Sequence, residues 1–285
     1  MRFLSNALLF LTTSTLFLAS TLAIERQECG SYASADKIEA SELAIKAHAA
    51  EFRQGRRAEM KDYVFDVYFN VIAKNMSLAG GWVPQKQIDD QMALLNKAYV
   101  GTGISWKLVN VTRVLSRYWH ETVTLGEPQA IQMARSFRKG KSTAFNVYTV
   151  GFYTEALNGY SAFPIDYRTD PYEDGCVLLF ETLPGGVSRE RQGGTLIHEA
   201  GHWLGLYHTF QGGCVGLGDR VADTPPSLKA SSGCPDFVDS CPGDGPDPIH
   251  NYMDYTNDTC RTEFTPGQIQ RIQDSMATYR SDPTI

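Results

Sequence analysis

The spacing of apolar residues along the chain changes repeatedly between two periods. From Tyr63 to Lys74, apolar and polar residues alternate among many β-branched and aromatic side chains, which is typical of a half-buried strand. The same strand chemistry recurs at residues 104–114, 145–153 and 176–183. Helical spacing of apolar residues, by contrast, is found at residues 83–101 and 128–140. The first half of the chain therefore predicts an α/β or α+β layered sheet.

This periodicity is lost after His208. Residues 211–248 are rich in Gly, Pro, Asp and Ser, which predicts an irregular segment. Loops of this length inside a compact domain are usually functional or braced from outside. A final helix is predicted at residues 265–280, because Thr265 can cap it and Pro266 stands at its first position.

The chain begins with a pattern typical of a secretory signal peptide, residues 1–23. One arginine is followed by a mostly apolar stretch from Ala7 to Leu18 and then by small residues. The apolar stretch is shorter than the roughly 20 residues that a membrane-spanning helix needs, and no later segment is long and apolar enough. We therefore expect a secreted, extracellular protein without a membrane anchor.

Residues 24–57 are helix-prone and end in the basic pair Arg56 and Arg57. Two interpretations remain open. The segment is either an N-terminal helix packed on the domain or a propeptide removed at the basic pair, which would leave a catalytic domain at residues 58–285. A secreted protein starting near Ala58 would support processing, and one starting near Ile24 would oppose it.

Composition narrows the classes of partner. The 285 residues are 42% hydrophobic, enough for a core, and carry a formal net charge of −6 without a concentrated basic face. Nucleic-acid binding normally needs such a face, so no nucleic-acid partner is expected. We expect a monomer.

An oxidising compartment changes how the six cysteines are interpreted, because it favours disulfides. Four of them fall in or beside the irregular segment, where two local disulfides would brace a region with little core of its own: Cys214, Cys234, Cys241 and Cys260. Sequons that fit the same compartment begin at Asn75, Asn110 and Asn257.

The run HEAGHWLGLYH concentrates three of the chain's six histidines in one short stretch. His198 and His202 are four residues apart, so on a helix both imidazoles lie on one face and can bind one ion. Glu199 is one step round that helix, beside the ion, where a general base acting on a metal-activated water belongs. Gly205 allows the helix to stop and the chain to turn, which brings His208 round as a third ligand. Three imidazoles leave a fourth tetrahedral position open, the arrangement of a catalytic zinc site.

This run resembles the extended zinc motif of the metzincin metalloproteases, and NYMDYT around Met253 resembles their methionine turn. The downstream block is similar to the pappalysin family within the metzincins, especially its secreted fungal and archaeal endopeptidases. The resemblance covers roughly Tyr63 to Arg280 and is strongest from Gly194 onward. It implies an α+β fold with a twisted mixed sheet and backing helices above the active-site helix. An irregular lower subdomain, residues 209–285, would be braced by disulfides, with the cleft between the two parts.

The resemblance also implies roles for individual residues. Met253 would form an apolar floor beneath the metal, a role close to that of an ordinary core methionine. Tyr255 resembles a tyrosine that reaches the zinc or the reaction intermediate in several metzincin families, although a merely anchored side chain is the alternative. The implied disulfides are Cys214–Cys241 and Cys234–Cys260.

The sequence leaves two questions open: whether the chain binds calcium, and what Cys29 and Cys176 do. The segment GDRVADTP suggests calcium bound through Asp219 and Thr224, because oxygen donors in a turn suit that ion, but a plain turn explains it equally. Cys29 and Cys176 either pair in a third disulfide, which we favour, or Cys29 ligates the zinc in a latent precursor. The second reading leaves Cys176 unpaired.

The expected function is hydrolysis of peptide bonds in proteins by a secreted zinc endopeptidase. Glu199 would deprotonate the water and pass the proton to the leaving amine, and Tyr255 would stabilise the oxyanion. An edge strand, for which the segment starting near Cys176 is the candidate, would hold an extended substrate. The alternatives are a secreted binding protein on the same scaffold, or another zinc-dependent amide hydrolase.

Overall fold

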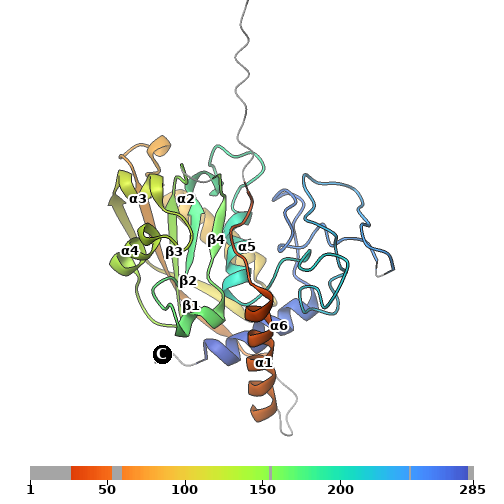
Figure 1. Cartoon of the computed structure of the whole chain (residues 1–285). Coiled ribbons are helices and arrows are strands. Elements are labelled where there is room, and N and C mark those ends of the chain that lie inside the picture. Colours follow the sequence, from red (N-terminus) through yellow and green to blue (C-terminus); the bar gives the residue numbers. More distant parts are fainter. Residues whose placement is uncertain (1–26, 53–59, 154–155, 244, 282–285) are drawn as a thin grey trace, which may run out of the picture.

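The computed structural model describes residues 27–52, 60–153, 156–243 and 245–281 (Figure 1). The predicted signal peptide and the basic pair Arg56–Arg57 lie outside the described residues. No helix within the described part is long and apolar enough to cross a membrane.

A five-stranded sheet forms the centre of the molecule, with strand order β2-β1-β3-β5-β4. Its strands are β1 (Tyr63–Ala73), β2 (Ile104–Leu115), β3 (Ala144–Val150), β4 (Gly159–Ser161) and β5 (Cys176–Leu179). Neighbouring strands are parallel except for β4, which pairs with β5 in the antiparallel direction. This mixed sheet with surrounding helices confirms the predicted α+β class.

Four strands lie where the sequence predicts strand-forming segments, whereas β4 was missed. Its three residues are too few to show a period of two. Because β4 lies at the end of the sheet, β5 is an interior strand. The expectation that the strand starting at Cys176 forms the edge is therefore wrong, because β4 covers it.

Helices cover both faces of the sheet. They are α1 (Ala35–Phe52), α2 (Gln85–Ala98), α3 (Arg117–Thr122), α4 (Pro128–Phe137), α5 (Gly194–Trp203) and α6 (Pro266–Tyr279), with short 3-10 turns at Leu78–Gly80, Pro164–Arg168 and Phe180–Thr182. A side chain at Gly159 would point at Glu199 of α5, whereas Tyr160 lines a cavity together with α4. Since successive strand residues point to opposite faces, α5 and α4 lie on opposite sides of the sheet.

An aromatic cluster fixes α5 on the sheet. The Trp203 ring packs edge-on against Phe65 of β1 at a centroid distance of 5.0 Å and in a tilted arrangement against Phe145 of β3 at 4.8 Å. Trp203 is fully buried, and burying a side chain of this size dominates core energetics. The helix that carries the zinc motif therefore has a rigid support.

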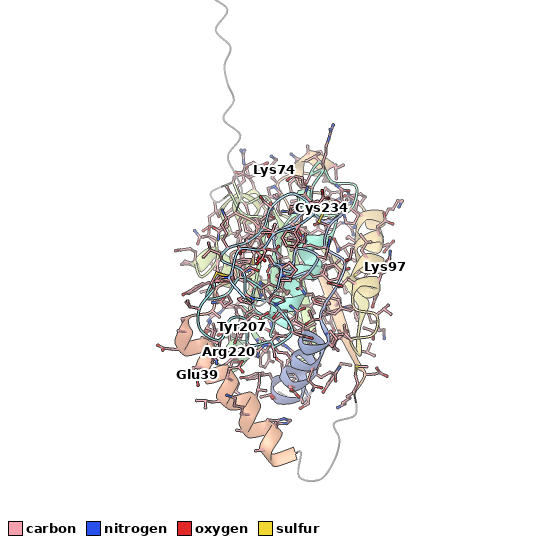
Figure 2. The ribbon with its side chains drawn as sticks, turned by 90° about the vertical axis from the view of Figure 1, so that its right-hand side faces the viewer. Glu39, Lys74, Lys97, Tyr207, Arg220 and Cys234 are labelled. Atoms are coloured by element: carbon pink, nitrogen blue, oxygen red, sulfur yellow. A yellow bond between two sulfur atoms is a disulfide. The ribbon has the colours of Figure 1, made fainter. Side chains whose placement is uncertain are left out.

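The region after α5 is irregular as predicted, and Figure 1 shows its loops on the side of α5 away from the sheet. The disulfides Cys214–Cys241 and Cys234–Cys260 close it, which confirms both implied pairings. An ion pair of 3.3 Å between Arg220 Nη2 and Glu39 Oε2 joins this region to α1, and both residues are seen at that boundary in Figure 2.

The described N-terminal segment passes in front of α5 before it forms α1, which packs against α6 (Figure 1). Its backbone adds to the edge of the sheet. The Gln27 amide donates to the Ala156 carbonyl, the Asn158 amide donates back to Gln27, and the Gly30 amide donates to Gly159. The segment therefore lies along β4, in front of the zinc motif.

Candidate active site

The three histidines of the motif converge on one point. His202 Nε2 lies 3.1 Å from His198 Nε2 and 3.1 Å from His208 Nε2. The turn after α5 makes this possible, because Gly205 adopts a φ of +98°, which is open to glycine at little cost. A Cβ at Gly205 would lie 2.4 Å from Ser275 Oγ, so the turn is pressed against α6. The predicted convergence of His198, His202 and His208 is confirmed.

The rings are oriented to present lone pairs to an ion. His198 Nδ1 donates to the Tyr252 carbonyl at 2.7 Å, and His202 Nδ1 donates to the Leu206 carbonyl at 2.8 Å. A carbonyl only accepts, so these Nδ1 atoms carry the protons and the Nε2 atoms are left as ligands. Burial lowers the pKa of all three imidazoles, that of His202 to about 4. They are therefore neutral, as metal ligands must be.

The spacing of these nitrogens fits zinc. Nitrogens that ligate a tetrahedral zinc at about 2.0–2.1 Å are roughly 3.3 Å from one another, close to the observed separations. Without an ion, the three acceptor nitrogens would face one another in a buried cluster with no hydrogen-bond donor between them, which is unfavourable. The residues present therefore fit a zinc ion, with Nε2 of His198, His202 and His208 as its ligands.

Cys29 supplies a fourth potential ligand. Its Sγ and the ligand nitrogens of the three histidines all lie within 4.8 Å of one another, and all four residues are buried. Cys29 belongs to the N-terminal segment, whereas Cys176 is inside the sheet on β5, and neither forms a disulfide. The favoured pairing of Cys29 with Cys176 is therefore wrong, because the segment directs Cys29 toward the histidines instead.

Glu199 is fully buried beside His198. Its Oε2 accepts a hydrogen bond of 3.0 Å from Ser31 Oγ of the N-terminal segment, and its Oε1 has no partner among the described residues. Burial raises the pKa of this carboxyl to about 8. Gly159 leaves the space in front of it, since a Cβ there would lie 3.0 Å from Glu199 Oε1. A carboxyl in this position is poised for proton transfer.

Tyr255 and Met253 belong to the loop that packs beneath α5. The Tyr255 hydroxyl lies 3.2 Å from His208 Nε2, and it donates to the Cys29 carbonyl at 3.4 Å. Burial raises the pKa of Tyr255, so the phenol stays protonated and able to donate. Met253 is fully buried, and a Cβ on Gly201 would come within 2.4 Å of its Sδ, so the methionine packs directly under α5.

Sequence reasoning missed three residues that border this site. Ser31 contacts Glu199, and Arg191 forms an ion pair with Glu28, which precedes Cys29. These contacts join residues more than 160 positions apart. No local spacing could have indicated them.

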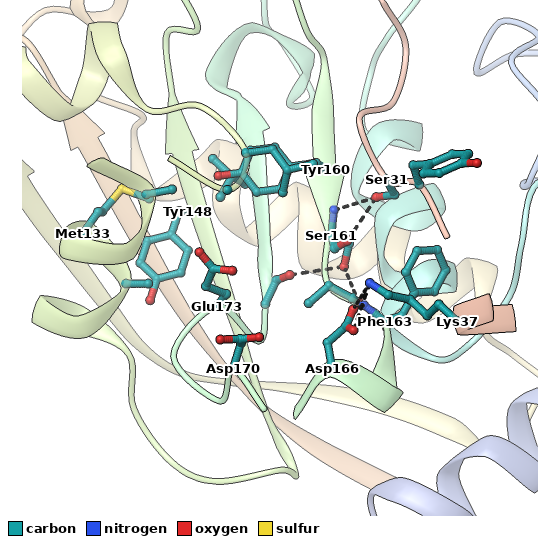
Figure 3. Close-up of a pocket in the computed structure, with 18 residues that line it drawn as sticks. Ser31, Lys37, Met133, Tyr148, Tyr160, Ser161, Phe163, Asp166, Asp170 and Glu173 are labelled. Atoms are coloured by element: carbon teal, nitrogen blue, oxygen red, sulfur yellow. Dashed lines mark hydrogen bonds and ion pairs between the residues drawn. The ribbon is translucent and has the colours of Figure 1, made fainter. Parts of the chain in front are cut away.

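A separate cavity of about 270 Å³ lies under β4, next to the same segment (Figure 3). Lys37 stands at its side, with Nζ 2.9 Å from Asp166 Oδ1. Tyr148, Asp170 and Glu173 also line it. Burial and the neighbouring carboxylates Asp170 and Asp166 raise the pKa of Glu173. The N-terminal segment and α1 thus contact β4 through backbone groups and the 3-10 turn Pro164–Arg168 through an ion pair.

The remaining predicted residues lie away from the histidines. Both carboxylate oxygens of Asp219 accept from Thr224 Oγ1, at 2.7 and 2.9 Å. Calcium binding by this pair stays a prediction. Of the sequon asparagines, Asn75 and Asn110 are exposed and Asn257 is partly buried, and their glycosylation also stays a prediction.

Comparison with known proteins decides which family this site represents. Residues 182–277 match the model of the peptidase M43 family, described as pregnancy-associated plasma protein-A. An extracellular metalloprotease of Verticillium alfalfae is 39% identical over 260 residues, which is 89% of this chain and 90% of that protein. The chain belongs to the peptidase M43, or pappalysin, family. An extracellular metalloprotease of Sordaria macrospora is 44% identical over 225 residues, covering 77% of each chain.

Solved structures show the same fold as this pappalysin. A Tannerella forsythia promirolysin mutant superposes with a TM-score of 0.72 at 25% identity, covering 88% of this chain and 94% of that one. Mature mirolysin in complex with a cleaved peptide gives a TM-score of 0.64 at 24% identity and covers 78% and 97%. Family and site together make this chain a zinc metalloendopeptidase of the metzincin type that acts on polypeptides. The alternative of a binding protein is not favoured.

Proposed function

We propose that the chain is the secreted precursor of this endopeptidase, in which Glu199 is the general base and the N-terminal segment holds the site closed. The observation that carries the proposal is the placement of Cys29. Its Sγ stands with the three histidine nitrogens at the point where a catalytic zinc site keeps one position open.

The chemistry divides between the ion and the chain. When bound by the three histidines, zinc supplies a Lewis acid that activates water and polarises a carbonyl. Glu199 accepts the proton of the attacking water and returns it to the leaving amine, since its Oε1 is buried without a partner among the described residues. The Tyr255 hydroxyl, held beside His208, donates to the developing oxyanion.

The edge strand β4 is proposed to bind the substrate. Its backbone groups already bond an extended chain, because Gly30 donates to the Gly159 carbonyl at 2.8 Å. A polypeptide that replaces the N-terminal segment can use the same backbone groups by strand addition. Specificity then depends on side chains that flank this edge.

Latency follows from the same contacts. Cys29 would complete the set of zinc ligands. The Ser31 hydroxyl donates a hydrogen bond to the Glu199 carboxylate and so engages one oxygen of the proposed base. The match to promirolysin spans more of this chain, 88%, than the match to mature mirolysin, 78%, which supports a propeptide at the N-terminus. Removal at Arg56–Arg57 would release the catalytic domain, residues 58–285.

The extracellular location of the protein is part of the same proposal. Relatives are named extracellular metalloproteases, and residues 1–23 have the pattern of a signal peptide. We propose secretion of a monomer without a membrane anchor, and calcium bound at Asp219 and Thr224 as an additional ion.

The replacement Glu199→Gln tests the role of the base. The amide keeps the size and position of the side chain but cannot accept the proton, so zinc content should stay unchanged. The rate of peptide cleavage should fall by about 10²-fold or more. The control is Glu127→Gln, the same chemical change at an exposed residue, which should leave cleavage unchanged. Normal cleavage by Glu199→Gln would remove Glu199 as the base.

A further inference from the structure

We propose that Arg191 forms a subsite for an acidic side chain of the substrate, next to the scissile bond. In the described structure Glu28 occupies this subsite. The inference rests on the proposed function, because the segment that carries Glu28 must leave the cleft before a substrate can enter.

The occupant shows which chemistry the subsite accepts. Arg191 Nε donates to Glu28 Oε2 at 2.6 Å, and Arg191 Nη2 contacts Glu28 Oε1 at 2.5 Å. Two parallel contacts from one guanidinium edge to one carboxylate are the strong bidentate geometry that arginine forms with planar anions. Asn158 beside β4 adds a hydrogen bond of 2.8 Å from Nδ2 to Glu28 Oε2. The subsite therefore has three donors for one carboxylate.

The catalytic domain holds the guanidinium in place without help from Glu28. Arg191 Nη2 donates to the Tyr255 carbonyl at 3.1 Å, and Nη1 donates to the carbonyls of Thr256 at 3.0 Å and Glu190 at 3.4 Å. An arginine has five N–H donors, so these three bonds leave two for Glu28. When the N-terminal segment departs, the Nε–Nη2 edge is left fixed and free to bind a carboxylate.

Charge supports an anionic occupant. Arg191 is only 4% exposed, and a buried cation without a partner is costly. Its nearest remaining carboxylate is Asp258, with Oδ1 3.8 Å from Nη1, on the side away from Nε. Asp258 is already bound by Arg261 and by the amides of Gln192 and Gly194. Loss of Glu28 therefore leaves a positive site that an acidic side chain fills best.

The position of the subsite places that side chain beside the reaction. Glu28 immediately precedes Cys29, whose Sγ faces the three histidines. Arg191 shares a cavity of about 910 Å³ with Tyr255 and Asn158, and the Tyr255 hydroxyl is 3.2 Å from His208 Nε2. A substrate that lies along β4 in place of the segment would present a flanking side chain to Arg191.

The competing explanation is that the ion pair only fastens the N-terminal segment in the precursor. Two variants separate the two roles. Glu28→Gln removes the same ion pair from the precursor but leaves Arg191 intact in the processed enzyme. Arg191→Gln removes the proposed subsite from both forms.

The experiment compares processed wild type, Glu28→Gln and Arg191→Gln on peptides that differ only by Glu or Gln at each position flanking the scissile bond. The peptides are amidated at the C-terminus, so the side chain carries the varied charge. N-terminal sequencing verifies that residue 28 has been removed. Wild type and Glu28→Gln should favour Glu at one flanking position by about tenfold or more in kcat/KM. Arg191→Gln should lose this preference.

Several outcomes would overturn the subsite. Equal cleavage of Glu and Gln peptides by wild type would contradict it, whether or not Arg191→Gln folds. A preference that persists in a folded Arg191→Gln, checked by its melting temperature, would assign it to another residue. A preference seen only with free C-terminal peptides would assign the site to a terminal carboxylate. Absence of any cleavage by processed wild type would instead contradict the proposed endopeptidase.

Discussion

At the scale of single residues, a thiol from the chain itself lies beside the three histidines, where it could complete a set of four ligands. The Cys29 Sγ lies with His198, His202 and His208, and Tyr255 donates to the Cys29 carbonyl. Burial and the nearby Glu199 carboxylate raise the pKa of this thiol, whereas a zinc ion favours the thiolate. The bond between ion and sulfur would thus stabilise the closed form.

Replacing Cys29 by alanine should make the unprocessed precursor active. Loss of a ligand that contributes more than about 1.4 kcal/mol shifts the balance between closed and open sites about tenfold or more. The measurement is peptidase activity of the full chain with the Arg56–Arg57 bond intact. Cys176→Ala is the control, because this second buried thiol lies in β5 and should not change latency. An inactive Cys29→Ala precursor would show that other contacts suffice for latency.

Asp219 should make stability depend on pH. Burial raises its pKa from 3.8 to about 7, so the folded state favours the protonated acid. This contribution is fully present below pH 3.8 and is lost as pH rises toward about 7. In calcium-free buffer, wild type should therefore lose stability relative to Asp219→Asn between pH 4 and pH 7, by an amount on the order of a few kcal/mol.

Urea unfolding of both proteins with their disulfides intact measures this difference. A constant difference across that pH range would contradict the role of Asp219. If the pair with Thr224 binds calcium, adding the ion should restore wild-type stability at neutral pH, because ligand binding to the folded state adds stability.

At the scale of elements, the end of α5 decides whether the third histidine reaches the metal. Gly205 has a φ of +98° and lies against Ser275 of α6, and Met253 packs against Gly201 from below. The helix, its terminal turn and α6 therefore form one support for the ligand set.

Gly205→Ala should both destabilise the protein and weaken zinc binding. A left-handed conformation costs a non-glycine residue about 1–2 kcal/mol, and the added methyl group would also clash with Ser275 Oγ. The matched control is Gly126→Ala, where φ is +74° but no atom lies within 4 Å of the added group. The control should show only the conformational cost and keep its zinc. Equal zinc affinity in both variants would contradict the supporting role of the turn.

Element prediction succeeded where a pattern extends over several turns or alternations. The strands β1, β2 and β3 and the helices α2, α4 and α6 lie close to their predicted positions. The shorter β4 and α3, with three and six residues, were missed. Missing β4 led to the wrong choice of edge strand, because β4 is the edge along which the N-terminal segment binds.

At the scale of the whole molecule, a buried ion pair ties the C-terminal helix to the sheet. Arg280, at the end of α6, contacts Asp174 before β5 through Nη2 at 2.7 Å and donates to the Ser142 carbonyl at 2.7 Å. Its guanidinium also covers the Trp203 ring. The active-site helix, the sheet and the last helix are therefore linked through one side chain.

Arg280→Ala should lower the free energy of unfolding by about 3–5 kcal/mol, because it leaves the buried Asp174 carboxylate with an incomplete set of cationic partners. The control is Arg117→Ala, which removes an exposed, solvent-screened ion pair with Glu121 and should leave the free energy of unfolding nearly unchanged. Chemical denaturation measures both values. Similar losses in the two variants would contradict the central role of Arg280.

The ligand set and its chemistry could be predicted without the structure, because His198, Glu199, His202 and Gly205 act through spacings of a few residues that one helix and one turn convert directly into geometry. Resemblance to a family added both C-terminal disulfides. Tertiary structure alone decided the partner of Cys29, the identity of the edge strand and the contact of Arg191 with Glu28. The contacts of Cys29 and Arg191 join segments separated by more than a hundred residues, and no local period records which distant side chains will meet. The edge strand β4 has only three residues, too few to show a period of its own.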